Sequence, residues 1–395
     1  PAANIINLRV LNKDGSGRDS DVIAAINRAI ELKATYNIRV INLSLGRPVF
    51  ESWTTDALCQ AAEAATAAGI LVVTSAGNMG QFNTGGISGY GTIKSPGHDP
   101  YVLTVGATNM KNTGPRGDDV VTSYSSKGPS IFGQVVKPDL VAPGNRIGAA
   151  LQATSTIAVQ NPSLIVGGGY PANKYIQLSG TSMATPMAAG AAALLIQRES
   201  YLTPAMVKAR LMRSASKSFP ASSTVTNGKG TFTTHHDLVT VGAGHLDIAA
   251  ALGDFNLGTE GSVSPRLTQS SFGGITLSDV VSYDSAGWFD NTIGGGEVTA
   301  FSTSGEESYT TTGGTIGYLL GVNWSVYGPL LYGPLNVSST AVLNTAGKVW
   351  GDPAVNGNSI LWGDSILWGD SILWGDSILW GDSILWGDSY FGGEN

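Results

Sequence analysis

Apolar segments of strand length alternate with helix-length segments through the first 253 residues of this chain of 395. The runs ILVVTS at 70–75 and YVLTVGA at 101–107 are almost continuously apolar, which is typical of strands buried on both faces in a parallel sheet. Segments with apolar residues at helical spacing lie between and after them. Because parallel strands need helices on both faces, this alternation predicts the α/β fold class with a mainly parallel sheet.

The expected elements can be placed by residue number. Strands are expected at 4–11, 39–45, 70–75 and 101–107, and helices at about 22–34, 54–68, 182–198, 204–215 and 246–252. Asp19 or Ser20 is expected to cap the first helix, because short polar side chains accept hydrogen bonds from its free N–H groups. Gly69 is expected to end the second helix.

The balance of charged residues divides the chain. Residues 1–253 carry 20 Lys and Arg against 14 Asp and Glu, whereas residues 254–395 carry 2 against 15. The second region is rich in Gly, Ser and Thr and shows no helical periodicity. We therefore expect a domain at 1–253, a β-rich or irregular appendage at 254–350, and a separate tail at 351–395.

Composition excludes several classes of protein. A formal net charge of −7 argues against nucleic-acid binding, which needs a basic patch. No run of 18 apolar residues is present, so no transmembrane segment is expected. The single cysteine, Cys59, excludes an internal disulfide framework and a cysteine-built zinc site. In its Ala-rich helix it is expected to be a small buried apolar residue.

The tail repeats the unit Ser-Ile-Leu-Trp-Gly-Asp with a period of six from Ser359. Because six is even, Ile, Trp and Asp of every unit would share one face of an extended chain. One interpretation is a solvated or loosely β-structured acidic segment. The other is an interaction element that self-associates or contacts a surface, since identical β-prone units with aligned aromatic residues can pair.

A serine stands at the expected start of the helix at 182–198. Ser182 follows the turn formed by Gly180 and Thr181, within the run LSGTSMATP. At a helix start the serine hydroxyl is exposed, its backbone N–H is free, and the partial positive charge of the helix end favours a developing anion. An ordinary helix cap uses the same residue types, so this motif leaves both interpretations open.

A polar residue also follows the strand expected at 70–75. Asn78 lies in the glycine-framed turn SAGNMG. Its side-chain amide could donate a hydrogen bond to a developing oxyanion. The alternative is that Asn78 only adopts the left-handed turn conformation that asparagine tolerates.

Six segments carry a resemblance to a known family. GTSMATP resembles the nucleophile motif of the subtilisin-like serine peptidases, and SAGN resembles the segment with their oxyanion asparagine. Four more segments match in family order: VINLSLG at 40–46, SSKGP at 125–129, KPDLVAPG at 137–144 and GAGHLDIAAAL at 242–252. The resemblance implies a subtilisin-like three-layer sandwich and a serine endopeptidase that acts through an acyl-enzyme.

The resemblance also implies roles for particular residues. Ser182 would be the nucleophile, and Asn78 with the Ser182 N–H would form the oxyanion hole. The implied substrate-binding residues are Ser44, Leu45 and Gly46, which would pair with an extended substrate; Ser75, Ala76 and Gly77, which would line the primary specificity pocket; and Gly180 and Thr181. Lys94 falls near the floor of that pocket and could favour acidic side chains, but a solvated loop lysine is the preferred interpretation.

The chain departs from the family in its catalytic Asp and His. The family's Asp-Thr-Gly and His-Gly-Thr-His segments should precede the strand expected at 4–11, and neither is in the sequence. The four histidines do not match that place: His98 is expected in a loop beside the pocket, His245 at a helix start, and His235 and His236 in a polar loop. We expect that the catalytic Asp and His lie upstream, because the serine motif and Asn78 are intact and the sequence starts inside a strand. The alternative is a catalytically inactive surface or interaction protein on a protease scaffold.

The remaining expectations rest on the resemblance alone. No cofactor can be assigned from the residues, and calcium is possible because it is common in the family. The partner would be a protein or peptide substrate. The family also implies a secreted or cell-surface location.

Overall fold

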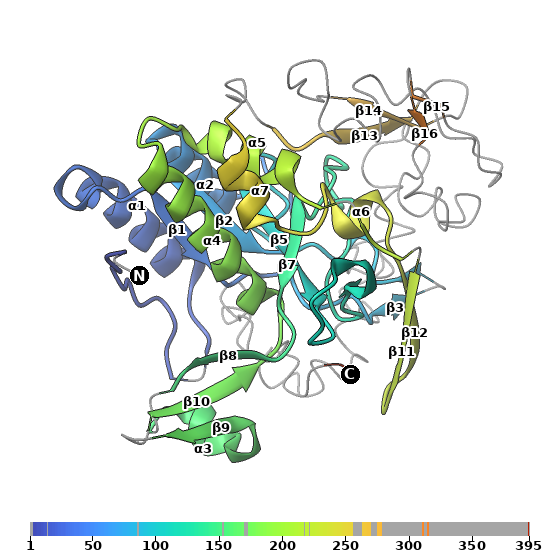
Figure 1. Ribbon diagram of the computed structural model, residues 1–395. Helices are drawn as coiled ribbons and strands as arrows, with labels where there is room; N and C mark the ends of the chain where they lie inside the picture. Colours follow the sequence, from blue (N-terminus) through green and yellow to red (C-terminus); the bar gives the residue numbers. More distant parts are fainter. Residues whose placement is uncertain are drawn as a thin grey trace, which may run out of the picture.

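The computed structural model describes residues 3–13, 15–84, 87–151, 154–169, 173–216, 218–220, 222–255, 263–269, 275–278, 310–311, 314–315 and 394 (Figure 1). Its centre is a sheet in which β1 (Val40–Leu43), β2 (Leu71–Ser75), β5 (Leu103–Asn109) and β7 (Leu140–Pro143) are parallel neighbours in that order. The short β6 (Val120–Val121) pairs antiparallel with the end of β5. The α/β class with a mainly parallel sheet is therefore confirmed.

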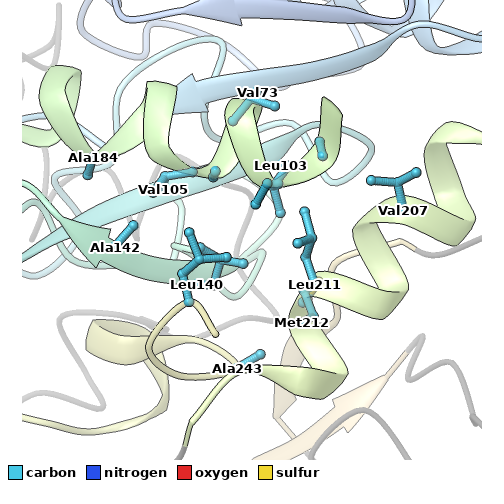
Figure 2. Close-up of a cluster of buried hydrophobic side chains, with 14 of the residues drawn as sticks. Val73, Leu103, Val105, Leu140, Ala142, Ala184, Val207, Leu211, Met212 and Ala243 are labelled. Carbon is cyan, nitrogen blue, oxygen red and sulfur yellow. The ribbon is translucent and has the colours of Figure 1, made fainter. Parts of the chain in front are cut away.

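Helices cover both faces of this sheet, and β2 shows the sequence basis. Ile70 and Val72 belong to the core cluster with α1 (Asp19–Tyr36) and α2 (Ala57–Ala67), whereas Leu71 and Val73 point into the opposite cluster. The second cluster contains α4 (Thr181–Arg198), α5 (Pro204–Ser214) and α7 (Ile248–Gly253). Figure 2 shows strand residues Val73, Leu103, Val105, Leu140 and Ala142 against Ala184, Val207, Leu211 and Met212 from these helices.

Smaller elements surround the sandwich. A three-stranded antiparallel sheet has the order β8–β10–β9, and the other small sheets are two-stranded. Their bounds, with those of the remaining helices, are β3 (Asn83–Thr84), β4 (Ile87–Ser88), β8 (Ile147–Ala150), α3 (Thr156–Gln160), β9 (Ile165–Gly169), β10 (Asn173–Leu178), β11 (Ser222–Asn227), β12 (Gly230–His235), α6 (Leu238–Val241), β13 (Arg266–Gln269), β14 (Ile275–Ser278), β15 (Thr310–Thr311) and β16 (Gly314–Thr315).

The helix expected at 54–68 is confirmed, but it begins later. The Asp56 side chain accepts hydrogen bonds from the N–H groups of Leu58 and Cys59, so the carboxylate fixes the start of α2 at Ala57. Gly69 follows its last turn with φ +82°, a left-handed conformation that ends the helix as expected. Cys59 is fully buried in α2, which confirms the expectation for that residue.

The expected cap of the first helix is wrong. The N-cap of α1 is Arg18, with no side-chain hydrogen bond, and Asp19 is the first helical residue. The Asp19 carboxylate instead accepts a hydrogen bond from Arg47 Nε at 2.6 Å. The Asp19 carboxylate, which was expected to cap the helix, is therefore bound by the Arg47 guanidinium instead.

The strand expected at 4–11 is also wrong. Residues 4–11 form no strand, and Ile5 and Ile6 are 90% and 39% exposed. Strand structure requires a partner edge, whereas periodicity reports only which side chains are apolar. Within the described residues, β1 pairs with β2 alone, and the segment at 4–11 pairs with no strand.

Most of the second region lies outside the described residues, as does the tail apart from Glu394. The described parts of the expected appendage at 254–350 include two hairpins, β13–β14 and β15–β16. Residues next to the first hairpin contact the sandwich, since Ser264 Oγ accepts a hydrogen bond from Lys208 Nζ at 2.8 Å. The boundaries at 253 and 350 stay predictions.

Candidate active site

Two loops and one helix meet at the carboxyl edge of the parallel sheet. β1 and β2 are neighbours, with Leu43 opposite Thr74, so the residues that follow them lie side by side. Ser75 Oγ donates to the Leu45 carbonyl at 3.3 Å and joins the two loops. In open α/β sheets, ligands bind at this edge.

Ser182 lies at the second position of α4 and is partly exposed. Pro186 is inside the same helix and has no N–H, so the Ser182 carbonyl lacks its helical partner. Ser44 Oγ supplies the missing donor at 2.8 Å. In return, Ser182 Oγ donates to the Ser44 carbonyl at 3.3 Å. Two hydrogen bonds thus fix the serine against the end of β1.

Asn78 contacts the same helix start. Its Oδ1 accepts hydrogen bonds from Thr181 N at 2.9 Å and from Thr181 Oγ1 at 3.1 Å. Thr181 Oγ1 in turn accepts from Gly77 N at 3.2 Å. Because Oδ1 is bound twice, the orientation of the amide is determined, and Nδ2 is the atom left for another acceptor.

The Asn78 Nδ2 atom is buried and has no hydrogen-bond partner within the described part of the chain. It lies 3.3 Å from the position that a Cβ on Gly180 would take. Gly180 itself has φ +151°, which disfavours other residues there. The result is an open amide donor beside the backbone turn that leads to Ser182.

Lys94 corrects the sequence-based interpretation. It was expected to be solvated, but its side chain is only 4% exposed. A Cβ on Gly46 would lie 3.1 Å from Lys94 Cβ, and a Cβ on Gly77 would lie 2.9 Å from Lys94 Cγ. The aliphatic stem therefore lies between the two segments expected to bind substrate, and glycine at both positions makes room for it. Burial lowers the pKa of Lys94 to about 8.

The four histidines lie in other surroundings. His98 contacts Cys59 and lies 3.9 Å from Asp56, and burial lowers its pKa to about 4. His235 closes β12. His236 is buried with its Nδ1 2.6 Å from the Pro220 carbonyl, so the pair is not in a polar loop as expected. The buried His245 packs against Phe219, two residues before the Asp247 cap of α7. The acceptor of the Ser182 hydroxyl is the Ser44 carbonyl and not a histidine.

Asp56, Cys59 and His98 bring three potential metal ligands within 4.8 Å of one another, all of them buried. The Asp56 carboxylate, however, already accepts hydrogen bonds from Arg47 Nη2 at 2.9 Å and Ser95 Oγ at 2.8 Å. Burial also raises the pKa of the Cys59 thiol well above its ordinary value, which disfavours the thiolate. A thiol, an imidazole and a guanidinium-paired carboxylate do not match the oxygen ligands that calcium prefers.

The chain belongs to the subtilase family, whose profile matches residues 1–237. It is 39% identical over 226 residues to serine protease AprX of Bacillus subtilis, covering 55% of this chain and 47% of that protein. It is 33% identical over 215 residues to subtilisin DY of Bacillus licheniformis, covering 54% of this chain and 62% of that protein. The chain thus spans about half the length of these curated relatives. The solved structure of sphericase covers 52% of this chain and 58% of its own at 28% identity and a TM-score of 0.40, too low to add to the fold assignment.

The structure thus joins Ser182, Asn78, Ser44, Gly180 and Thr181 by direct contacts or close approach. It links Ser75 to Leu45, and it places Gly46 and Gly77 on either side of Lys94. The sequence analysis did not anticipate the effect of Pro186 on the Ser182 carbonyl. The missing N–H of proline was the signal that could have shown it. No helix in the described residues is both long and apolar enough to cross a membrane.

Proposed function

We propose that the protein is a serine endopeptidase that hydrolyses peptide bonds through an acyl-enzyme on Ser182. The carrying observation is the buried Asn78 amide, whose free Nδ2 lies beside the turn that leads into Ser182. Membership of the subtilase family supports the same reaction class. A buried donor left open at a helix start is suited to a charge that exists only during the reaction.

The chemistry follows from these positions. Ser182 Oγ attacks the substrate carbonyl and forms a tetrahedral intermediate, whose oxyanion accepts hydrogen bonds from Asn78 Nδ2 and from the Ser182 N–H. The 18-residue helix α4 adds the partial positive charge of its N-terminus. Collapse of the intermediate releases the amine and leaves the acyl group on Ser182, which water then hydrolyses. The substrate would pair with the Ser44–Gly46 segment as an added strand.

A serine hydroxyl needs a general base, because the alcohol is a weak nucleophile. The four histidines of the sequence lie in other contacts, and the Ser182 hydroxyl donates to a carbonyl. We therefore propose that the catalytic His and Asp belong to a segment upstream of Pro1. In a protein that contains this segment, the histidine would accept the hydrogen bond that Ser182 Oγ now donates to the Ser44 carbonyl.

A fluorophosphonate probe tests this function, because it labels only activated serines. We expect labelling of the protein translated from the complete upstream reading frame, and loss of labelling in the S182A variant. The matched control S200A, at an exposed serine after α4, should be labelled as strongly as the parent. If the complete protein carries no label at Ser182, the alternative is favoured, an inactive interaction protein on a protease scaffold.

Lys94 supports a finer proposal about the substrate. Its buried stem lies between Gly46 and Gly77, and the resemblance puts the residue near the floor of the specificity pocket, where an ammonium would attract an acidic side chain before the scissile bond. Peptide substrates that differ only in Glu or Gln at that position would test it in the complete protein. We expect a preference for Glu that the K94M variant loses while it keeps the probe label on Ser182.

Two further properties come from the family alone. Calcium binding would stabilise the fold, and the residues described here assign no site for it. A secreted or surface location would suit an endopeptidase that acts on proteins. Metal analysis of the purified protein and fractionation of the producing cells would test these two proposals.

A further inference from the structure

Glu394 is bound by the sandwich although it lies far from it in sequence. It is 4% exposed and contacts three residues at the carboxyl edge of the sheet. Asn109 ends β5, Ser123 follows β6, and Asn145 follows β7. Since β5 and β7 are parallel neighbours, the residues that end or follow them lie close together.

Ser123 binds the Glu394 carboxylate with its backbone N–H and its hydroxyl. Ser123 N lies 3.1 Å from Oε1 and 3.2 Å from Oε2, and Ser123 Oγ donates to Oε1 as well. Gln81 Nε2 donates to Ser123 Oγ at 2.6 Å, so the hydroxyl keeps its own hydrogen for the carboxylate. Burial raises the pKa of Glu394, and the hydrogen bonds from Ser123 oppose that rise. These contacts match an acceptor-only carboxylate, since a glutamine would place a donor against a donor.

The backbone of Glu394 is bound as well. Asn145 Nδ2 donates to the Glu394 carbonyl at 2.8 Å, and Asn145 Oδ1 accepts from the Glu394 N–H at 2.8 Å. Asn109 Nδ2 adds a contact of 3.3 Å to the same carbonyl, while its Oδ1 accepts from Lys111 N. Both polar groups of the residue's backbone are therefore paired in addition to its side chain.

We propose that Ser123, Asn109 and Asn145 form a binding site for a glutamate within a peptide segment, and that Glu394 fills this site in cis. The site is distinct from Ser182 but adjoins its loop. Gly180 N donates to the Gly144 carbonyl at 2.8 Å, and Arg146 N donates to Ser179 Oγ at 2.9 Å. Asn145 therefore lies between two residues that are hydrogen-bonded to the turn before the nucleophile.

Amide exchange in the full chain tests the contact in cis. We expect the Ser123 N–H to exchange at least about tenfold faster in E394A and in E394Q than in the parent, because a charge-assisted hydrogen bond is lost. The matched control D388A removes an acidic residue from the same end of the chain and should leave this rate unchanged. Unchanged exchange at Ser123 in E394A would overturn the proposal.

Peptide binding tests the recognition itself. A fluorescein-labelled peptide YFGGEN, which copies residues 390–395, should bind the full-length E394A variant but not the parent, whose own glutamate competes at high effective concentration. The peptide YFGGQN should not bind, and N145A added to E394A should weaken binding at least about tenfold. Failure of YFGGEN to bind E394A, or equal binding of both peptides, would overturn the assignment as a glutamate site.

Discussion

Two polar clusters in this molecule differ in whether their donors are used. In the first, Asp139 accepts from Lys137 Nζ and Thr104 N, both at 2.7 Å, and lies 3.3 Å from Lys208 Nζ. The Lys208 ammonium donates its three hydrogens to the carbonyls of Pro100 and Val102 and to Ser264 Oγ. In the second, the Asn78 amide keeps a buried Nδ2 with no partner among the described residues.

The difference separates a structural network from a site that can receive a ligand. A saturated network stabilises the fold, because every buried charge is compensated. An open donor costs free energy in the resting protein, and that cost is recovered only when an acceptor arrives. Under the proposed function, the acceptor for Asn78 would be the oxyanion of a peptide bond under attack.

The largest expected effect comes from breaking the saturated cluster. D139N leaves Lys137 and Lys208 buried without their carboxylate, and we expect the free energy of unfolding to fall by about 3–5 kcal/mol. Chemical denaturation would measure it. The control E31Q removes an exposed pair between Arg28 and Glu31, and should change stability by less than about 0.5 kcal/mol. A D139N protein as stable as this control would show that the cluster is not structural.

An intermediate effect on the free energy of unfolding is expected at Asp99, whose buried carboxylate, like the Asn78 amide, has an atom without a hydrogen-bond partner among the described residues. Its Oδ2 has no partner in the described residues, and burial raises its pKa to about 7. Because the folded state binds the proton more tightly, this contribution to stability is fully present below about pH 4 and is lost as pH rises through 7. Asn cannot titrate, so D99N should be more stable than the parent by about 1–3 kcal/mol at pH 8.

Thermal or chemical unfolding of both proteins from pH 4 to pH 8 would measure the Asp99 effect. Tyr101 N donates to Oδ1, and Asn keeps that acceptor. The pH-dependent fall in stability should therefore shrink in D99N without a change in fold. Parallel curves for the two proteins would contradict the expectation.

The smallest effect on stability is expected at Asn78. N78D keeps the oxygen that accepts from Thr181 and replaces only the open donor. The N-terminus of α4 offsets part of the cost of the buried carboxylate, so the free energy of unfolding should fall by about 1 kcal/mol. Labelling of Ser182 in the complete protein should nevertheless slow by about 10²–10³, the usual cost of one oxyanion donor. Slow labelling with a large loss of stability would assign Asn78 a structural role instead.

The sequence predicted most of the sandwich because its core strands carry their own signal. Ile70 to Val73 is apolar on both faces, and that pattern favours burial whichever strands lie beside it. The segment at 4–11 is also rich in apolar residues, but it includes Asn4, Asn7 and Arg9 and pairs with no strand among the described residues. The sequence of one strand alone does not specify its pairing partner.

Only those residues of the candidate site that lie within short sequence motifs could be predicted. Ser182 and Asn78 were singled out from their motifs, and the structure brings them together through Thr181. Their catalytic roles stay predictions, as does the expectation that the catalytic Asp and His lie upstream. The burial of Lys94 depends on two glycines that are 48 and 17 positions away in the chain. A local sequence pattern cannot predict contacts over such distances. The contacts of Glu394 could not be predicted for the same reason, because its partners lie 249 to 285 residues earlier.

The contacts of Glu394 and Ser264 have a topological consequence. Ser264 is bound to Pro100 and Lys208, and Glu394 to Ser123 and Asn145, so two residues far apart in sequence are both hydrogen-bonded to the sandwich. They bound a continuous stretch of chain between positions 264 and 394. A single cut within it would separate two pieces on a denaturing gel while both stayed attached to the native protein, and release of the outer piece would require the Glu394 contacts to open.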